Sequence, residues 1–309
     1  MMKIRPLCPE LAEKAKLELN EDPARIEEDI QHMKDWIAKQ PHLKARTDDQ
    51  WLIAFLRGCK YSRERAKQKY DLYYTLRTSA PDLFHYKHNE KKFMDILDLG
   101  AMLMLPKLQA VTAPAIMIAR IGVYDPNKYS IGEIAAVSNV LQEIAYYEND
   151  TLVIAGGRAI IDLDGVTTGH FMQMTPTTVK KMTVMSQDAS PLRMKGAHYI
   201  NTPTGFETVY NLFKTFLNEK NRNRLYVHNK NYDEMYQHIS KDILPVEYGG
   251  NGGTVQEIID YWKNKVTEYA SWLEEGVNCG TDESKRPGKP KTAEDLFGLD
   301  GSFRQLQFD

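Results

Sequence analysis

The stretch that decides the fold runs from Ala189 to His228 and reads ASPLRMKGAHYINTPTGFETVYNLFKTFLNEKNRNRLYVH. It predicts a short strand over Ala197–Asn201, a turn at Pro203, and then an amphipathic helix. Large apolar residues recur at three- and four-residue spacing, which places them on one face of that helix. These apolar residues are Phe206, Val209, Tyr210, Phe213, Phe216 and Leu217.

Positive charge brackets this helix. The stretch holds six Lys or Arg against two Glu, with Arg193 and Lys195 before the helix and Lys220 and Arg224 after it. Thr204 is the expected N-cap, because its hydroxyl can accept a hydrogen bond from an unpaired helical N–H. Such a helix could cover an apolar ligand while its charges face an anionic membrane. An ordinary core helix beside a solvated basic surface shows the same pattern. The choice between a ligand cover and a core helix therefore depends on the rest of the chain.

Composition limits the class of protein. The chain has 309 residues, a formal net charge of −2, 42% hydrophobic and 27% charged residues, as in ordinary globular proteins. A near-neutral chain is not a nucleic-acid binder as a whole. No apolar run approaches the roughly 18 residues of a membrane span, and the charged first thirty residues contain no signal-peptide core. Three widely spaced cysteines favour a reducing compartment, so we expect a cytoplasmic protein.

Three parts follow one another along the chain. Residues 1–88 read as a helical module, wholly helical over the first 80 or so. In residues 89–253 strands alternate with helices, which predicts an α/β sheet covered on both faces. Residues 254–309 contain a C-terminal helix, expected over Ile258–Leu273, and a partly flexible tail with a linker at Lys285–Lys291. Apolar residues in the tail are expected to dock back on the body; they are Phe297, Leu299, Phe303, Leu306 and Phe308.

Catalytic motifs are missing from the sequence. There is no nucleophile elbow, Walker A loop, HExxH or CxxC motif, so we expect no enzyme, no cofactor and no metal site. Asp162 and Asp164 follow a predicted strand at Arg158–Leu163, and paired carboxylates can do acid–base work. A turn at this place also uses Asp to bind backbone groups. A hydrolase or isomerase built on these carboxylates is therefore an alternative that no nucleophile supports.

Five motifs occur in the order of one known family. They are DDQWLIAFLRGCKYSRERAKQKY at Asp48–Tyr70, IIDLDG at Ile160–Gly165, PLRMKGAHYINTP at Pro191–Pro203, FLNEKNRNRLYVH at Phe216–His228 and DILPVEYGG at Asp242–Gly250. With these motifs, the chain resembles the CRAL-TRIO lipid-binding family over roughly residues 25 to 275. The resemblance is to its branch of tocopherol- and retinaldehyde-binding members.

The resemblance implies a fold and a site. The fold would be a helical N-terminal module followed by an α/β/α lipid-binding domain with a mixed sheet. The helix at about Pro203–Leu217 would act as a mobile gate over the lipid. In the tocopherol-binding branch, four basic residues around the gate bind phosphoinositide head groups, and the matching positions are Arg193, Lys195, Lys220 and Arg224. Gly58 and Cys59 stand where the family usually has Ala-Arg, so head-group contacts from that segment are not carried over.

The implied function is binding and transfer of a small hydrophobic lipid between membranes, without catalysis. A tocopherol, a retinoid or a carotenoid would be a suitable ligand, and phosphoinositide binding would be coupled to its release. The partners would be that lipid and an anionic membrane surface, which a monomeric cytoplasmic protein visits transiently. The alternative is a regulatory module that binds and presents phosphatidylinositol, as in the wider family.

Overall fold

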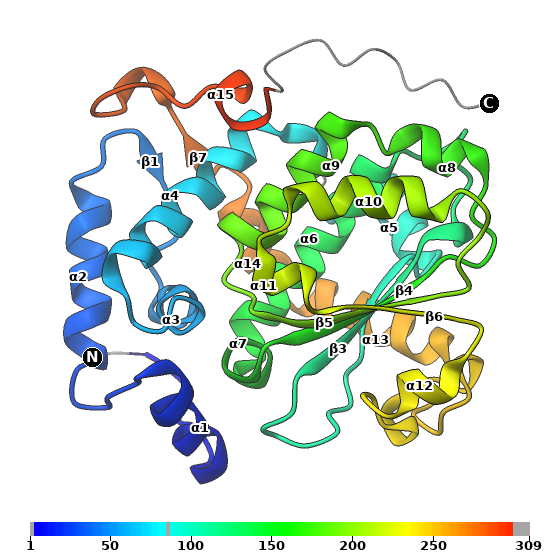
Figure 1. Ribbon diagram of the computed structural model, residues 1–309. Helices are drawn as coiled ribbons and strands as arrows, with labels where there is room; N and C mark the ends of the chain where they lie inside the picture. The colour runs from blue at the N-terminus through cyan, green and yellow to red at the C-terminus, as the bar shows by residue number, and fades with distance from the viewer. Residues whose placement is uncertain (1–2, 85–86, 299–309) are drawn as a thin grey trace.

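The computed structural model describes residues 3–84 and 87–298 (Figure 1). A five-stranded sheet lies at its centre, in the order β2-β3-β4-β5-β6. The strands are β2 (Met102–Met104), β3 (Ala115–Arg120), β4 (Gly157–Asp162), β5 (Met194–Ile200) and β6 (Leu225–Asn229). β2 is antiparallel to β3, and the other neighbouring strands are parallel. The sheet is therefore mixed, as the resemblance implied.

Helical crossovers join the parallel strands, because parallel neighbours cannot be connected by a tight hairpin. The crossover from β3 to β4 consists of η2 (Ile121–Val123), α6 (Ile131–Glu148) and α7 (Asp150–Ala155). The next consists of α8 (Thr168–Gln173), α9 (Pro176–Thr183) and the π-helical turn η3 (Val184–Ala189). The last, from β5 to β6, consists of α10 (Phe206–Phe216) and α11 (Glu219–Arg222).

The N-terminal part is mostly helical. It contains α1 (Pro9–Leu19), α2 (Ile26–Ala38), α3 (Asp49–Gly58), α4 (Arg63–Ser79), η1 (Pro81–Leu83) and α5 (Lys91–Asp98). One short strand interrupts these helices, since β1 (Leu43–Lys44) pairs antiparallel with β7 (Gly280–Thr281). The prediction that the first 80 residues are wholly helical is therefore wrong at β1. Two residues are too few for a sequence pattern, and their partner strand lies near the other end of the chain.

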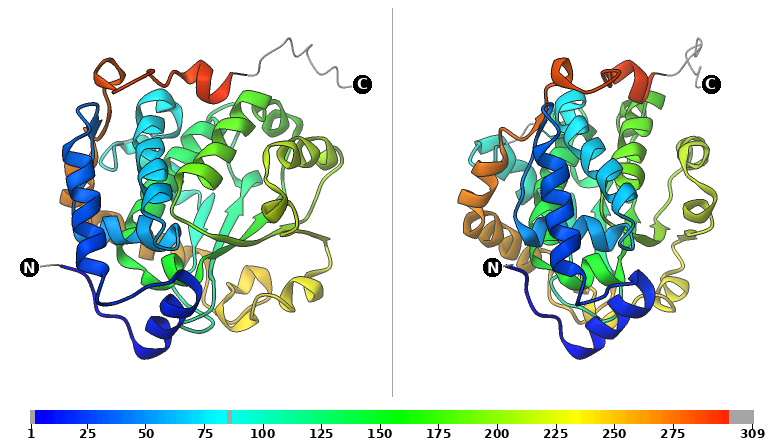
Figure 2. Two further views of the ribbon diagram at one scale, coloured as in Figure 1. Left: turned by 60° about the vertical axis from the view of Figure 1, so that its left-hand side comes forward. Right: turned by 90° about the vertical axis from the view of Figure 1, so that its left-hand side faces the viewer.

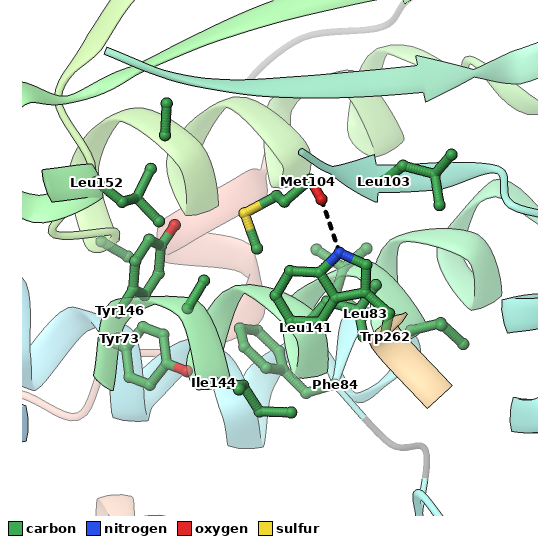
Figure 3. Packing of buried hydrophobic residues seen from close by; sticks show 14 of the residues in the cluster. Tyr73, Leu83, Phe84, Leu103, Met104, Leu141, Ile144, Tyr146, Leu152 and Trp262 are labelled. Atoms are coloured by element: carbon green, nitrogen blue, oxygen red, sulfur yellow. Dashed lines mark hydrogen bonds between the residues drawn. The ribbon is translucent and has the colours of Figure 1, made fainter. Parts of the chain in front are cut away.

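One hydrophobic core runs from the N-terminal helices to the sheet. Figure 3 shows Tyr73 and Phe84 from the N-terminal part packed in the same cluster as Met104 and Tyr146. Trp262 belongs to this cluster as well, and its Nε1 donates a hydrogen bond to the Met104 carbonyl at 2.8 Å. The helical and α/β parts thus share buried apolar surface, and a domain boundary at residues 88/89 stays a prediction.

The C-terminal quarter follows β6 around the sheet. Its elements are α12 (Tyr232–Tyr236), η4 (Lys241–Ile243), η5 (Val246–Tyr248), α13 (Val255–Glu268), α14 (Ala270–Gly276), η6 (Glu283–Lys285) and α15 (Ala293–Phe297). The single helix expected over Ile258–Leu273 is in fact two, because the chain leaves helical geometry at Tyr269 (φ −92°, ψ 8°).

The tail after α14 is held to the body rather than free. Arg286 and Lys291, which lie within the predicted linker, both contact the buried carboxylate of Asp71, at 2.9 and 2.5 Å. Phe297 is 3% exposed and docks on the body as expected. The other apolar tail residues named above lie outside the described residues.

The two faces of the sheet have different neighbours. Tyr199 of β5 contacts the rings of Phe206 and Tyr210 on α10, whereas the adjacent His198 contacts His228. Successive side chains of a strand point to opposite faces, so Tyr199 marks the face toward α10 and His198 marks the other. Figure 2 shows α10 and α11 on one side of the sheet and the helices α13 and α14 on the other.

Three histidines gather on the face away from α10. His198 is fully buried, its Nδ1 lies 2.9 Å from Nε2 of His228, and its ring centroid lies 5.2 Å from that of His238. Arg158 of β4 donates to the His238 carbonyl, and Glu234 of α12 lies 3.4 Å from His228. Burial, followed by the charges of His228, His238 and Arg158, lowers the pKa of His198 to about 3.

Acid is expected to destabilise the protein through His198. The unfolded chain binds a proton there at pH 6.5 and the folded chain only near pH 3, so the unfolded state binds more protons at acidic pH. The contribution of His198 to the free energy of unfolding is therefore fully present above pH 6.5. It declines as the pH falls toward 3, by about 2 kcal/mol at pH 5. Urea unfolding at neutral pH and at pH 5 should show a smaller acid loss in His198→Gln than in wild type. Equal losses in the two proteins would contradict this assignment.

Candidate functional site

The helix α10 begins later than its sequence indicated. Its N-cap is Gly205, whose φ of 87° is left-handed, and no side chain caps the helix. Thr204 is therefore not the N-cap, and that prediction is wrong. The chain turns sharply between β5 and α10, at Asn201 (φ 53°) and again at Gly205. Glycine adopts such a conformation without steric cost, so the second turn, rather than a capping hydroxyl, determines where the helix starts.

The apolar face of α10 is only partly buried. Phe206 is the buried residue of the helix, 8% exposed. The other predicted residues of this face are half-buried: Val209, Tyr210, Phe213, Phe216 and Leu217. Leu212 is half-buried too, and the predicted apolar face omitted it. The helix packs against α9, where Lys180 Nζ lies 5.4 Å from the centre of the Phe216 ring.

The face of the sheet toward α10 is apolar and also incompletely buried. Strand pairing places one row of side chains on this face, running from Met117 through Ala159 and Ala197 to Leu225. The half-buried residues of this face are Met102, Met117, Ala159, Ile161, Tyr199 and Leu225. On the opposite face, Ile118 and Ile160 are fully buried. Two apolar surfaces that keep accessible area thus face each other, with small alanines in the middle of the sheet.

The four predicted basic residues lie together beside α11 and the start of β5. Arg193 donates to the Ile154 carbonyl, and Arg224 donates to the Met194 carbonyl, so the backbone orients both guanidinium groups. Gly156, at the end of α7, has a φ of 85°, and a Cβ there would collide with the Arg193 carbonyl and the Lys195 stem. A glycine at this position lets the β5 start approach α7 closely.

Mutual repulsion shows that these charges form one cluster. Burial lowers the pKa of Lys195, and the charge of Arg193 lowers it further. The pKa of Lys220 is lowered by partial burial and then by four cations, which are Arg224, Lys60, Arg193 and Arg65. We define the basic cluster as the predicted four, Arg193, Lys195, Lys220 and Arg224, together with Lys60 and Arg65.

Lys60 and Arg65 were missed in the sequence. Lys60 lies in the turn between α3 and α4, where Lys60 and Tyr61 have φ values of 54° and 57°, and Arg65 lies in the first turn of α4. Two consecutive non-glycine residues with positive φ are unusual and often occur at functional sites. The available signal was the set of charges that follows Gly58 and Cys59, with Lys60 directly after Cys59 and Arg65 five residues further on, in the segment from which no head-group contacts were carried over. Nothing in the sequence pattern brings this turn next to α11.

Of the paired aspartates, Asp162 has a structural role. Asp162 Oδ1 accepts hydrogen bonds from the Asp164 N–H and from Asn201 Nδ2, and Oδ2 accepts one from the Tyr248 hydroxyl at 2.8 Å. Both oxygens of Asp162 thus cross-link the end of β4 to two other segments. In the part of the chain that the structure describes, no group of three or more His, Cys, Asp or Glu could hold a metal ion. Within the same residues, no helix has the length and apolarity that crossing a bilayer takes.

Two family models match this chain. The CRAL/TRIO domain matches residues 112–250, which include β3 to β6, α10 and most of the basic cluster. The Pinta-like UBA domain matches residues 22–92. The crystal structure of Sfh5 aligns with 86% of this chain and 100% of that chain, at 14% sequence identity and a TM-score of 0.47.

Known relatives match over most of the chain. The human alpha-tocopherol transfer protein-like protein is 30% identical over 249 residues, which cover 80% of this chain and 72% of the relative. Clavesin-2 of Rattus norvegicus is 30% identical over 271 residues, or 85% of this chain and 82% of the relative. These matches define an α/β protein of the lipid-binding kind. The chain belongs to the CRAL-TRIO family.

Proposed function

We propose that this protein binds a small hydrophobic lipid between the sheet and α10 and transfers it between membranes. We expect this lipid to be a tocopherol, a retinoid or a carotenoid, because the surfaces on both sides of this place are apolar. The basic cluster binds phosphoinositide head groups, and this binding is coupled to release of the lipid. The protein acts without catalysis, as a monomer that visits the membrane from the cytoplasm.

One observation carries the proposal: the apolar faces of α10 and of the sheet oppose each other and are both only half-buried. Large apolar side chains that keep accessible area lower the free energy when an apolar molecule covers them, by about 25 cal/mol per Å². Methionines at Met102 and Met117 suit a flexible ligand, since a thioether side chain adapts to irregular shapes. The sheet supplies a rigid floor and α10 a separate cover.

The same partial burial supports a gate. A helix whose apolar face is fully packed would cost much free energy to lift, whereas α10 has Phe206 as its buried residue. The basic cluster lies beside the C-terminal end of this helix, because Arg193 and Lys195 lie at the start of β5 while Lys220 and Arg224 follow α10. Anionic lipids attract each such charge by about 1 kcal/mol. Binding of a membrane to this cluster therefore acts on the C-terminal end of α10, which α11 follows.

Purified protein should carry one hydrophobic small molecule per chain, detected by native mass spectrometry and lipid extraction. The double variant Phe213→Asp, Phe216→Asp should lose that molecule about tenfold faster or more, because two half-buried rings contribute on the order of 2 kcal/mol. The control is Thr208→Asp, Thr215→Asp, which adds the same charges on the exposed side of α10.

Equal loss rates in the double variant and wild type would contradict the assignment of α10 as the cover. Recovery of a phospholipid instead of a vitamin-like lipid would favour the alternative function, a regulatory module that binds and presents phosphatidylinositol. A protein free of any apolar molecule, which also takes none up from vesicles, would contradict the proposed function.

A further inference from the structure

A carboxylate of α1 lies on the basic cluster. Glu18 Oε2 is 3.4 Å from Lys195 Nζ and 3.9 Å from Arg193 Nη1, and Glu18 Oε1 is 2.5 Å from Lys14 Nζ. The hydrogen bond from Lys14, followed by the charge of Lys195, lowers the pKa of Glu18. The carboxylate is therefore ionised at neutral pH and already pairs with two of the proposed head-group ligands.

The body of the protein holds α1 in this place. Leu11, Ala15 and Leu19 form a small separate core with Ile154 of α7. At the end of the helix, Glu21 accepts hydrogen bonds from Arg57 at 2.8 and 3.0 Å. These contacts fix the backbone of α1 but leave the Glu18 side chain partly exposed. The helix also precedes residues 22–92 and 112–250, to which the two family models match.

The rest of the basic cluster has no such partner. Within residues 3–84 and 87–298, Lys220 and Lys60 form no ion pair with an acidic side chain. The basic cluster thus contains two cations that pair with Glu18, Arg193 and Lys195, and others, such as Lys220 and Lys60, that pair with no carboxylate in the described residues. An anion that reaches all of them must replace Glu18.

We propose that Glu18 is a specificity-determining residue, an internal carboxylate that makes the basic cluster select head groups with several phosphate charges over singly charged lipids. This inference rests on the proposed function, in which the cluster binds phosphoinositides. A singly charged lipid that displaces Glu18 exchanges one negative charge for another, so it gains little. A polyvalent head group replaces that charge and in addition neutralises Lys220 and its neighbours.

The test compares Glu18→Gln with wild type on two kinds of vesicles matched for surface charge, one containing phosphatidylserine and one a phosphorylated phosphatidylinositol. We expect binding of the variant to phosphatidylserine vesicles to rise about fivefold, the effect of one additional uncompensated cation. Binding to phosphoinositide vesicles should rise less, so that the preference for phosphoinositide falls. Co-sedimentation over a range of lipid concentrations measures both values.

Glu13→Gln is the matched control, because Glu13 lies on the same helix, is exposed, and forms no ion pair in the described part of the chain. Glu13→Gln changes the net charge by the same amount as Glu18→Gln. It should leave the preference for phosphoinositide over phosphatidylserine vesicles unchanged. If Glu18→Gln and Glu13→Gln have the same preference as wild type, the role of Glu18 is refuted while the proposed function stands. If neither wild type nor Glu18→Gln binds anionic vesicles better than neutral ones, the proposed phosphoinositide binding fails and the role of Glu18 with it.

Discussion

Replacing Arg57 by methionine is expected to lower the free energy of unfolding by about 3–5 kcal/mol, the cost of leaving a buried charge without its partner. Arg57 of α3 is 1% exposed. Its Nε and Nη2 donate to Glu21, and its Nη1 donates to Asp150 at 2.7 Å. Methionine fills much of the same volume but leaves the buried Glu21 carboxylate without its cation, whereas Asp150 keeps the ion pair with Arg5 at 3.0 Å.

The measurement is urea unfolding of both proteins at neutral pH. Lys91→Met is the control, because Lys91 forms an exposed i,i+4 pair with Asp95, and such pairs contribute about 0.3–0.5 kcal/mol. A loss in Arg57→Met as small as that of the control would show that water reaches Glu21 and Asp150 in the folded protein. Since Glu21 follows α1, Arg57→Met should also loosen the helix that carries Glu18.

The double variant Arg193→Ala, Lys220→Ala is expected to bind anionic vesicles about thirtyfold more weakly than wild type. The estimate follows from about 1 kcal/mol per cation near the membrane surface. The difference should shrink at high salt, because exposed charges are screened beyond a Debye length of about 8 Å at physiological ionic strength. Retention of the hydrophobic ligand in free solution should change little, since the two cations lie outside the apolar face of α10.

Vesicle co-sedimentation with and without phosphoinositide measures this effect. The control, Lys91→Ala with Lys263→Ala, removes two cations that form ion pairs on α5 and α13. If the Arg193→Ala, Lys220→Ala variant and this control both bind anionic vesicles as strongly as wild type does at low salt, the basic cluster is ordinary solvated surface. An equal loss in both variants would instead indicate a general effect of net charge.

Several features could be predicted from the sequence because neighbouring residues determine them. The apolar periodicity of Phe206–Leu217 predicted the amphipathic helix, since the 3.6-residue repeat directly determines which side chains share a face. Alternating strands and helices predicted a covered α/β sheet, and the motif series from Asp48 to Gly250 predicted the family that the relatives show. The four cations were selected by the resemblance, and their roles remain proposals.

Other features were decided only by the tertiary structure. Periodicity identifies a face but not how deeply it is buried, so the half-buried state of α10 and of the sheet beneath it could not be read from the chain. The pairing of β1 with β7 joins segments from opposite ends. Glu18 contacts Lys195 across 177 positions, and Lys60, from a different part of the fold, lies near enough to Lys220 of α11 for its charge to lower the pKa of that lysine. Such contacts have no sequence periodicity, because they arise only where the packing of helices on the sheet brings distant segments together.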